Sequence, residues 1–215
     1  MKKVFIIILI SFILCFPVYS QENEITELSM EENALNSKSV VFIISSIDNK
    51  TDSYGSGVIL ENGIIVTCEH VVDKFDFLWI VTHNGEPQYW TCINVFYKNK
   101  KNDIAIIKLD TDGIPATLGN KNDLIPGSSI LAIGSPCGYE NTLSPGIFSG
   151  ITNLNGTEYI QITAPLDHGS SGSGVFDKYG KLIGIIARMN ETNNNFGFVI
   201  PIDKIMDIVN EFVKS

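Results

Sequence analysis

The segment Leu166–Phe176 carries residue types that can perform acyl-transfer chemistry. It reads LDHGSSGSGVF and lies between two apolar runs that we expect to be strands. A serine between small residues on a tight loop can present its hydroxyl to a substrate, and backbone N–H groups of that loop can converge on a developing oxyanion. We expect the amides of Gly169 and Ser171 to form this oxyanion hole. Composition alone does not choose among the loop serines, and a Gly/Ser-rich turn without chemistry is the alternative.

A serine hydroxyl is a weak nucleophile until a base takes its proton. The chain has three histidines. His70 follows the apolar run GIIVTCE, where the end of a strand can hold a side chain firmly at the edge of a cleft. His83 lies in the polar stretch THNGEP, which we interpret as a solvated turn. His168 is too close along the loop to Ser171 to act as its base, although it can contact substrate. His70 is therefore the expected base.

The histidine base in turn needs a carboxylate to orient it. Asp103 immediately precedes the apolar run IAIIKL, where an aspartate can simply cap a turn. A partly buried carboxylate there can also accept the Nδ1 proton of His70, fix its tautomer and stabilise the imidazolium. We therefore predict that Asp103, His70 and Ser171 act together.

We expect the segments that position these residues to be strands. From Val40 onward, short β-branched and aromatic runs are separated by Gly, Asn, Asp and Pro, which is typical of an antiparallel all-β protein. A polar stretch near 111–124 divides the runs into two similar halves. Pro201 begins a final segment with apolar residues at helical spacing, which predicts an amphipathic C-terminal helix. The phrase GSGV at 55–58 is interpreted as a tight turn into a strand, because no Gly-Lys-Ser/Thr follows it as in a phosphate loop.

Three blocks carry a family resemblance: GSGVILENGIIVTCEHVV, NDIAIIKLD and QITAPLDHGSSGSGVFDKYGKLIGI. They resemble the blocks of trypsin-like, chymotrypsin-fold serine peptidases, in particular the protease domains of the bacterial HtrA/DegP type, and occur in the same order. The resemblance implies His70 as general base, Asp103 as its orienting partner and Ser171 as nucleophile, with Gly169 at the oxyanion-loop glycine. It also implies two perpendicular six-stranded antiparallel β-barrels, with the triad in the cleft between them.

The chain departs from the family pattern around the expected nucleophile. Ser170 stands where the family usually has Asn or Asp, and Gly172-Ser173-Gly174 follows where Gly-Gly-Pro or Gly-Ser-Pro is usual. With these changes, the sequence does not decide whether the oxyanion loop has its active conformation at rest. HtrA-type proteins generally carry a C-terminal PDZ domain, and we expect none in this chain.

The N-terminal residues predict export. Two lysines, an apolar run and a small residue at Ser20 give the pattern of a cleavable signal peptide, which we favour over an uncleaved anchor or a lipoprotein at Cys15. The expected protein is then periplasmic or secreted. The expected organisation is a signal peptide at 1–20, a mobile N-terminal arm at 21–38, a peptidase domain at 39–200 with barrels at about 39–115 and 120–200, and a helix at 201–215.

Charge and cysteine usage limit the partners. A net charge of −9 argues against nucleic acid and anionic membrane surfaces. Cys68, Cys92 and Cys137 have no C-x-x-C spacing, so no metal site is expected, and a disulfide among them is left open. We expect no cofactor and no stable membrane insertion after signal cleavage. Polypeptide substrates are the expected partners, and a homo-oligomer is left open.

The function expected from these features is an exported serine endopeptidase that works through an acyl-enzyme. No carboxylate occupies 163–166, which argues against cleavage after Arg or Lys, and a pocket walled by Ile185, Ile186 and Ala187 would suit an aliphatic side chain.

A catalytically silent or chaperone-like binding module on the same fold is the alternative. An esterase of the α/β-hydrolase kind is disfavoured, because Ser171 lacks the Gly-x-Ser-x-Gly elbow.

Overall fold

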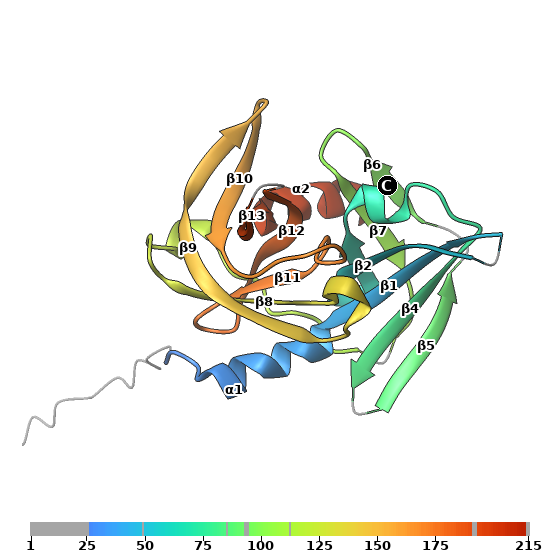
Figure 1. Ribbon diagram of the computed structural model, residues 1–215, viewed down its shortest axis with the longest axis horizontal. Coiled ribbons are helices and arrows are strands. Elements are labelled where there is room, and N and C mark those ends of the chain that lie inside the picture. Colours follow the sequence, from blue (N-terminus) through green and yellow to red (C-terminus); the bar gives the residue numbers. More distant parts are fainter. Residues whose placement is uncertain are drawn as a thin grey trace, which may run out of the picture.

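The computed structural model describes residues 26–48, 50–84, 86–92, 95–111, 113–190 and 193–213, and the expected signal peptide lies outside them. The described chain is mostly β, in two bodies that lie side by side (Figure 1). Its strands are β1 Val40–Ile47, β2 Lys50–Leu60, β3 Ile64–Thr67, β4 Phe77–Asn84, β5 Glu86–Cys92, β6 Tyr97–Asn99, β7 Ile104–Lys108, β8 Ser129–Gly134, β9 Thr142–Leu154, β10 Thr157–Thr163, β11 Gly174–Asp177, β12 Leu182–Asn190 and β13 Asn193–Pro201. Its helices are α1 Met30–Asn33 and α2 Ile202–Val213, with short 3₁₀ turns η1 Ala34–Ser39, η2 Glu61–Gly63, η3 Glu69–Val72, η4 Lys121–Asp123 and η5 Pro136–Gly138.

The second half is a closed antiparallel barrel, as the sequence predicted. Its six strands follow the order β10-β13-β12-β11-β8-β9. The first half differs from the expected six-stranded barrel, because it is a seven-stranded sheet in the order β5-β4-β1-β2-β3-β7-β6. The chain turns back along β4 to form β5, and β6 adds a short strand on the outer edge of β7. Among the described strands, no pairing joins β5 to β6.

The two halves share an apolar core. One buried cluster contains Ile43 and Val58 of the first sheet together with Ile133 and Phe176 of the barrel. A second cluster, which includes Phe148 of β9, lies within the second half alone. Because interiors are closely packed, the shared cluster fixes how the two halves sit against each other. Residues at the boundary can therefore combine into one site.

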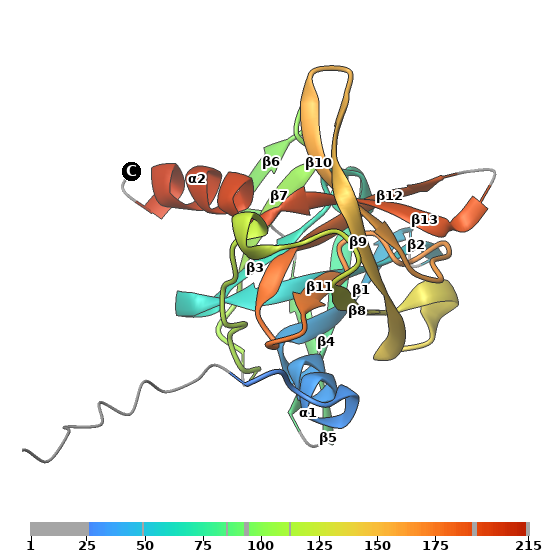
Figure 2. The ribbon, with the colours of Figure 1, turned by 90° about the vertical axis from the view of Figure 1, so that its left-hand side faces the viewer.

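The described part of the N-terminal arm, which we expected to be mobile, is hydrogen-bonded to the second half of the chain. Ser29 and Glu32 form a capping box that starts α1, each side chain accepting a hydrogen bond from the other's backbone N–H. The buried side chain of Asn33 donates to the carbonyl of Asp177 at 2.8 Å. This bond ties the arm to the end of β11, and α1 lies along the lower edge of the molecule in both ribbon views (Figures 1 and 2).

The C-terminal helix is confirmed as α2. Its apolar residues Ile202, Ile205 and Val209 are buried, and the helix contacts β12 and β13. No helix within the described ranges combines the length and the apolar character needed to cross a lipid bilayer.

Candidate active site

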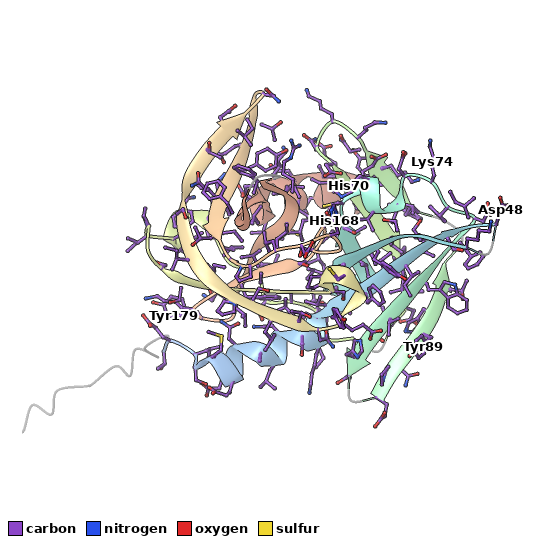
Figure 3. The ribbon with its side chains drawn as sticks, in the orientation of Figure 1. Asp48, His70, Lys74, Tyr89, His168 and Tyr179 are labelled. Carbon is purple, nitrogen blue, oxygen red and sulfur yellow. The ribbon has the colours of Figure 1, made fainter. Side chains whose placement is uncertain are left out.

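A cavity of about 420 Å³ contains most of the residues selected from the sequence. It is lined by Ser53, Tyr54, His70, Cys137, Asp167, His168, Gly169, Ser170, Ser171 and Ile186. The lining comes from both halves: β2 and η3 on one side, and the loop before β11 with part of β12 on the other. His70 and His168 lie near each other where the two halves meet (Figure 3).

His70 and Asp103 form a close pair in the first half. Nδ1 of His70 lies 2.9 Å from each carboxylate oxygen of Asp103, and the backbone N–H of His70 donates to Oδ1 at 3.1 Å. The antiparallel pairing of Thr67 with Ala105 aligns β3 and β7, so that His70 after one strand meets Asp103 before the other. A carboxylate that accepts the Nδ1 proton leaves Nε2 as the basic nitrogen. His70 is half exposed and lines the cavity, whereas Asp103 is only 18 % exposed.

The loop Asp167–Ser171 is folded by its own hydrogen bonds. The N–H of Ser170 donates to the carbonyl of Asp167 at 2.9 Å, and the N–H of Asp167 donates to Ser170 Oγ at 3.0 Å. Ser170, a departure from the family pattern, thus uses its hydroxyl to close the turn. Gly169 has φ +92°, and a Cβ there would lie 2.6 Å from the carbonyl oxygen of Ser135. Only glycine fits this position without strain.

Each carbonyl from His168 to Ser171 accepts a hydrogen bond. The donors are Cys137 N to His168 O (2.6 Å), Ser56 Oγ to Gly169 O (3.2 Å), Ser173 N to Ser170 O (3.0 Å) and Ser56 N to Ser171 O (2.8 Å). Because a trans peptide group is planar, a fixed carbonyl also fixes the N–H on its opposite side. Within the described part of the chain, the N–H groups of Gly169 and Ser171 have no hydrogen-bond partner. They are free to donate to an oxyanion.

The structure therefore brings His70, Gly169 and Ser171 to one cavity, with Asp103 behind His70. Among the described residues, no hydrogen bond joins His70 to Ser171 Oγ. Catalytic hydrogen bonds are often long or poorly aligned without substrate and tighten when it binds. The arrangement is chemically suited to deprotonating a serine hydroxyl and stabilising an oxyanion.

The three residues expected to wall an apolar pocket, Ile185, Ile186 and Ala187, do not all line this cavity. Only Ile186 lines the cavity, whereas Ile185 and Ala187 belong to the buried cluster that the two halves share. Successive side chains on a strand point to opposite faces, which separates the side chain of Ile186 from those of its two neighbours.

Asp167 is a site residue that the sequence reasoning missed. It lies directly after the segment 163–166 that lacks a carboxylate, and it is the only acidic residue among those lining the cavity. Its Oδ1 accepts the N–H of His168 at 2.7 Å. The pKa of the exposed Cys137 thiol is raised, mainly by desolvation and secondly by the negative charge of Asp167.

We expect a solvated turn at His83 from the sequence, and the structure differs. It belongs to β4, its side chain is 16 % exposed, and Nε2 lies 2.7 Å from Glu140 Oε2. The contact is short enough for an ion pair but is not directed as a hydrogen bond. His83 thus connects the first sheet to the segment before β9 and is not among the residues lining the cavity.

One group of side chains could in principle hold a metal ion. Ligand atoms of Cys68, His70 and Asp103 lie within 4.8 Å of one another. Cys68 is buried and its thiol donates to the carbonyl of Ile186 at 3.1 Å. Burial, and then the charge of Asp103, raise the pKa of this thiol well above its usual value, whereas metal binding requires the thiolate. The group is better suited to proton transfer. Cys68 and Cys137 are both free thiols.

Comparisons with known proteins agree with this geometry. A family model described as "Trypsin-like peptidase domain" matches residues 55–185. A "Probable periplasmic serine endoprotease DegP-like" of Pseudomonas savastanoi pv. phaseolicola is 32 % identical over 175 residues, which are 77 % of this chain and 36 % of that protein. "Protease Do-like 5, chloroplastic" of Arabidopsis thaliana is 39 % identical over 187 residues, covering 75 % of this chain and 58 % of the relative.

A solved structure supports the fold. The serine endoprotease from Yersinia pestis aligns with a TM-score of 0.75 at 23 % identity, covering 88 % of this chain and 69 % of that one. At this identity the likeness establishes the chymotrypsin-like fold alone. The chain spans little more than a third of the length of the DegP-like relative above.

Proposed function

The chain belongs to the trypsin-like peptidase family, whose model matches residues 55–185, and on that premise we propose that it hydrolyses peptide bonds as a serine-type endopeptidase. The observation that carries the proposal is the pair of unpaired N–H groups, on Gly169 and Ser171, in the cavity that His70 also lines. Two such donors, two residues apart on the loop that carries Ser171, can bind an oxyanion that forms beside this serine.

The geometry supports a two-step acyl transfer. His70 Nε2 takes the proton of Ser171 Oγ as the oxygen attacks the substrate carbonyl, and the N–H groups of Gly169 and Ser171 bind the resulting oxyanion. Asp103, held against Nδ1, stabilises the imidazolium. His70 then gives the proton to the departing amine, which leaves an acyl-enzyme on Ser171. In the second step His70 activates water, which hydrolyses the ester and restores the serine.

A catalytically silent binding module on the same fold is the second candidate. Such a module would need the cavity and its lining but no strict arrangement of the nucleophile loop. Here each of the loop carbonyls accepts a hydrogen bond, and His70 is paired with Asp103. This arrangement favours the enzyme, and the two candidates differ in one measurable property, turnover.

We predict that substitutions at the three catalytic positions remove turnover from a folded protein. Ser171→Ala and His70→Ala should abolish hydrolysis of an unfolded protein substrate, and Asp103→Asn should lower kcat by about 10⁴-fold because the imidazole takes the wrong tautomer. Initial rates of substrate cleavage measure these effects. Asp123→Asn, which removes an exposed carboxylate on η4, is the matched control and should retain the wild-type rate. Undiminished hydrolysis by Ser171→Ala would refute the assignment.

We further expect the cavity to favour cationic side chains next to the scissile bond. Among the described residues that line it, Asp167 alone is acidic, and its negative charge attracts lysine and arginine and repels glutamate. This revises the aliphatic preference expected from the sequence. In a peptide series with Lys, Leu or Glu on either side of the scissile bond, Asp167→Asn should lower the ratio of kcat/KM for Lys over Glu by about tenfold, or about 1.4 kcal/mol. An unchanged ratio would exclude Asp167 as the selecting group.

We also propose that the chain is exported and that residues 1–20 are removed. The order of basic, apolar and small residues in that segment supports this proposal. The DegP-like relative is named as a periplasmic protein, which also supports it. N-terminal sequencing of the protein recovered from cells should begin at Gln21. A mature protein that retains Met1 would contradict the proposal.

A further inference from the structure

Ser56 lies in the middle of β2 and is completely buried. The sequence suggested that GSGV at 55–58 is a turn, but β2 runs without interruption from Lys50 to Leu60. Although Ser56 belongs to the first sheet, all the hydrogen-bond partners of its hydroxyl lie in the second half. We propose that Ser56 is a positioning residue that holds the oxyanion hole in its working orientation, an inference that rests on the proposed peptidase function.

The Ser56 hydroxyl uses its full hydrogen-bonding capacity on the second half. It donates to the carbonyl of Gly169 at 3.2 Å, accepts the N–H of Ser135 at 2.9 Å, and accepts the hydroxyl of Ser173 at 3.3 Å. A hydroxyl offers one donor and two lone pairs, so no capacity remains. One side chain thus joins the nucleophile loop, the segment after β8 and the residue before β11.

The backbone of Ser56 strengthens the same connection. Its N–H donates to the carbonyl of Ser171 at 2.8 Å, and its carbonyl accepts the hydroxyl of Thr67 at 2.7 Å. Thr67 is the last residue of β3, and η3 with His70 follows closely after it. The nucleophile and the strand that leads to the base are therefore both bonded to Ser56.

Two glycines allow this close approach. A Cβ on Gly172 would lie 1.9 Å from the carbonyl oxygen of Ser56, and a Cβ on Gly134 would lie 2.9 Å from its Oγ and 1.7 Å from Ser173 Oγ. Gly172 also has φ +82°, which glycine adopts without strain. The contact around Ser56 is thus too close for any side chain at these two positions.

The bond to Gly169 is the one that bears on the oxyanion hole. Glycine rotates easily about φ and ψ, so the peptide groups on either side of Gly169 can turn unless both are held. Cys137 N holds the preceding group through the carbonyl of His168. The following group, which joins Gly169 to Ser170, is held by Ser56 Oγ at its carbonyl and by the bond from its N–H to the carbonyl of Asp167. Loss of the Ser56 hydroxyl would leave the Gly169 carbonyl without its donor and loosen the peptide group that lies between the two N–H groups of the oxyanion hole.

We expect Ser56→Ala to act on the transition state rather than on substrate binding. The oxyanion forms only as the carbonyl is attacked, so kcat should fall while KM stays nearly constant. Direct removal of one oxyanion donor costs about 10²–10³-fold in kcat, and we expect about 10- to 100-fold for the indirect loss. Affinity for a peptide aldehyde should fall by a similar factor, because Ser171 Oγ adds to its carbon and the resulting oxygen needs the hole.

Ser45→Ala is the matched control. Ser45 is also a buried serine of the first sheet, but its hydroxyl donates to the carbonyl of Lys74 and it does not line the cavity. Both variants lose one buried hydroxyl, so both should melt at a lower temperature. Ser56→Cys, which keeps nearly the original size but bonds weakly, is a second variant should the alanine protein fail to fold.

The test combines kinetics with amide hydrogen exchange of the peptide spanning 164–174. The expected result is a joint fall in kcat and aldehyde affinity, with faster exchange in this peptide, for the Ser56 variants but not for Ser45→Ala. Folded Ser56 variants with wild-type kcat and wild-type exchange would overturn the inference. If the wild-type protein does not turn over substrate, the proposed function fails, and the exchange comparison still decides whether Ser56 holds the loop.

Discussion

Two backbone N–H groups must stay without a partner if a tight loop is to bind an oxyanion. A protein normally pairs its backbone N–H groups, and a loop can do so by turning its peptide groups. The loop Asp167–Ser171 must therefore be held against rearrangements that would satisfy them. The carbonyls from His168 to Ser171 are each bonded to a donor, and those donors come from both halves of the molecule. The site depends on this network of carbonyl anchors.

The hydrogen bonds to the loop carbonyls form only if the two halves keep a fixed position relative to each other. The base and its carboxylate come from the first sheet, where the pairing of β3 with β7 brings His70 and Asp103 together. The nucleophile comes from the loop before β11 in the closed barrel. The shared apolar cluster and the hydrogen bonds of Ser56 cross the boundary between them. Packing thus sets the overall placement, and directed hydrogen bonds set the orientation of the loop.

Local sequence patterns predicted the features that depend on local chemistry. The glycine-rich loop with Ser171, the strand end at His70 and the amphipathic helix α2 were all visible from neighbouring residues. The extra strands of the first sheet, the contact of His83 with Glu140 and the anchoring of Asn33 depend on long-range pairing, which periodicity does not encode.

Other differences had a signal in the sequence. The alternation of β12 should have excluded Ile185 and Ala187 from the pocket that Ile186 lines. Asp167 stands one residue beyond the segment 163–166, which has no carboxylate. Ser56 gave no local signal, because a buried serine in a strand reveals its partners only after folding.

Phosphonylation of the purified protein by a fluorophosphonate probe tests the central claim most directly, because phosphorus bonds to the attacking oxygen as fluoride leaves. Peptide mapping by mass spectrometry locates the adduct. We predict an adduct on Ser171 that is absent from Ser171→Ala and that forms much more slowly in His70→Ala. A folded wild-type protein that is not labelled, or one labelled on Ser170 or Ser173 instead, would contradict the account.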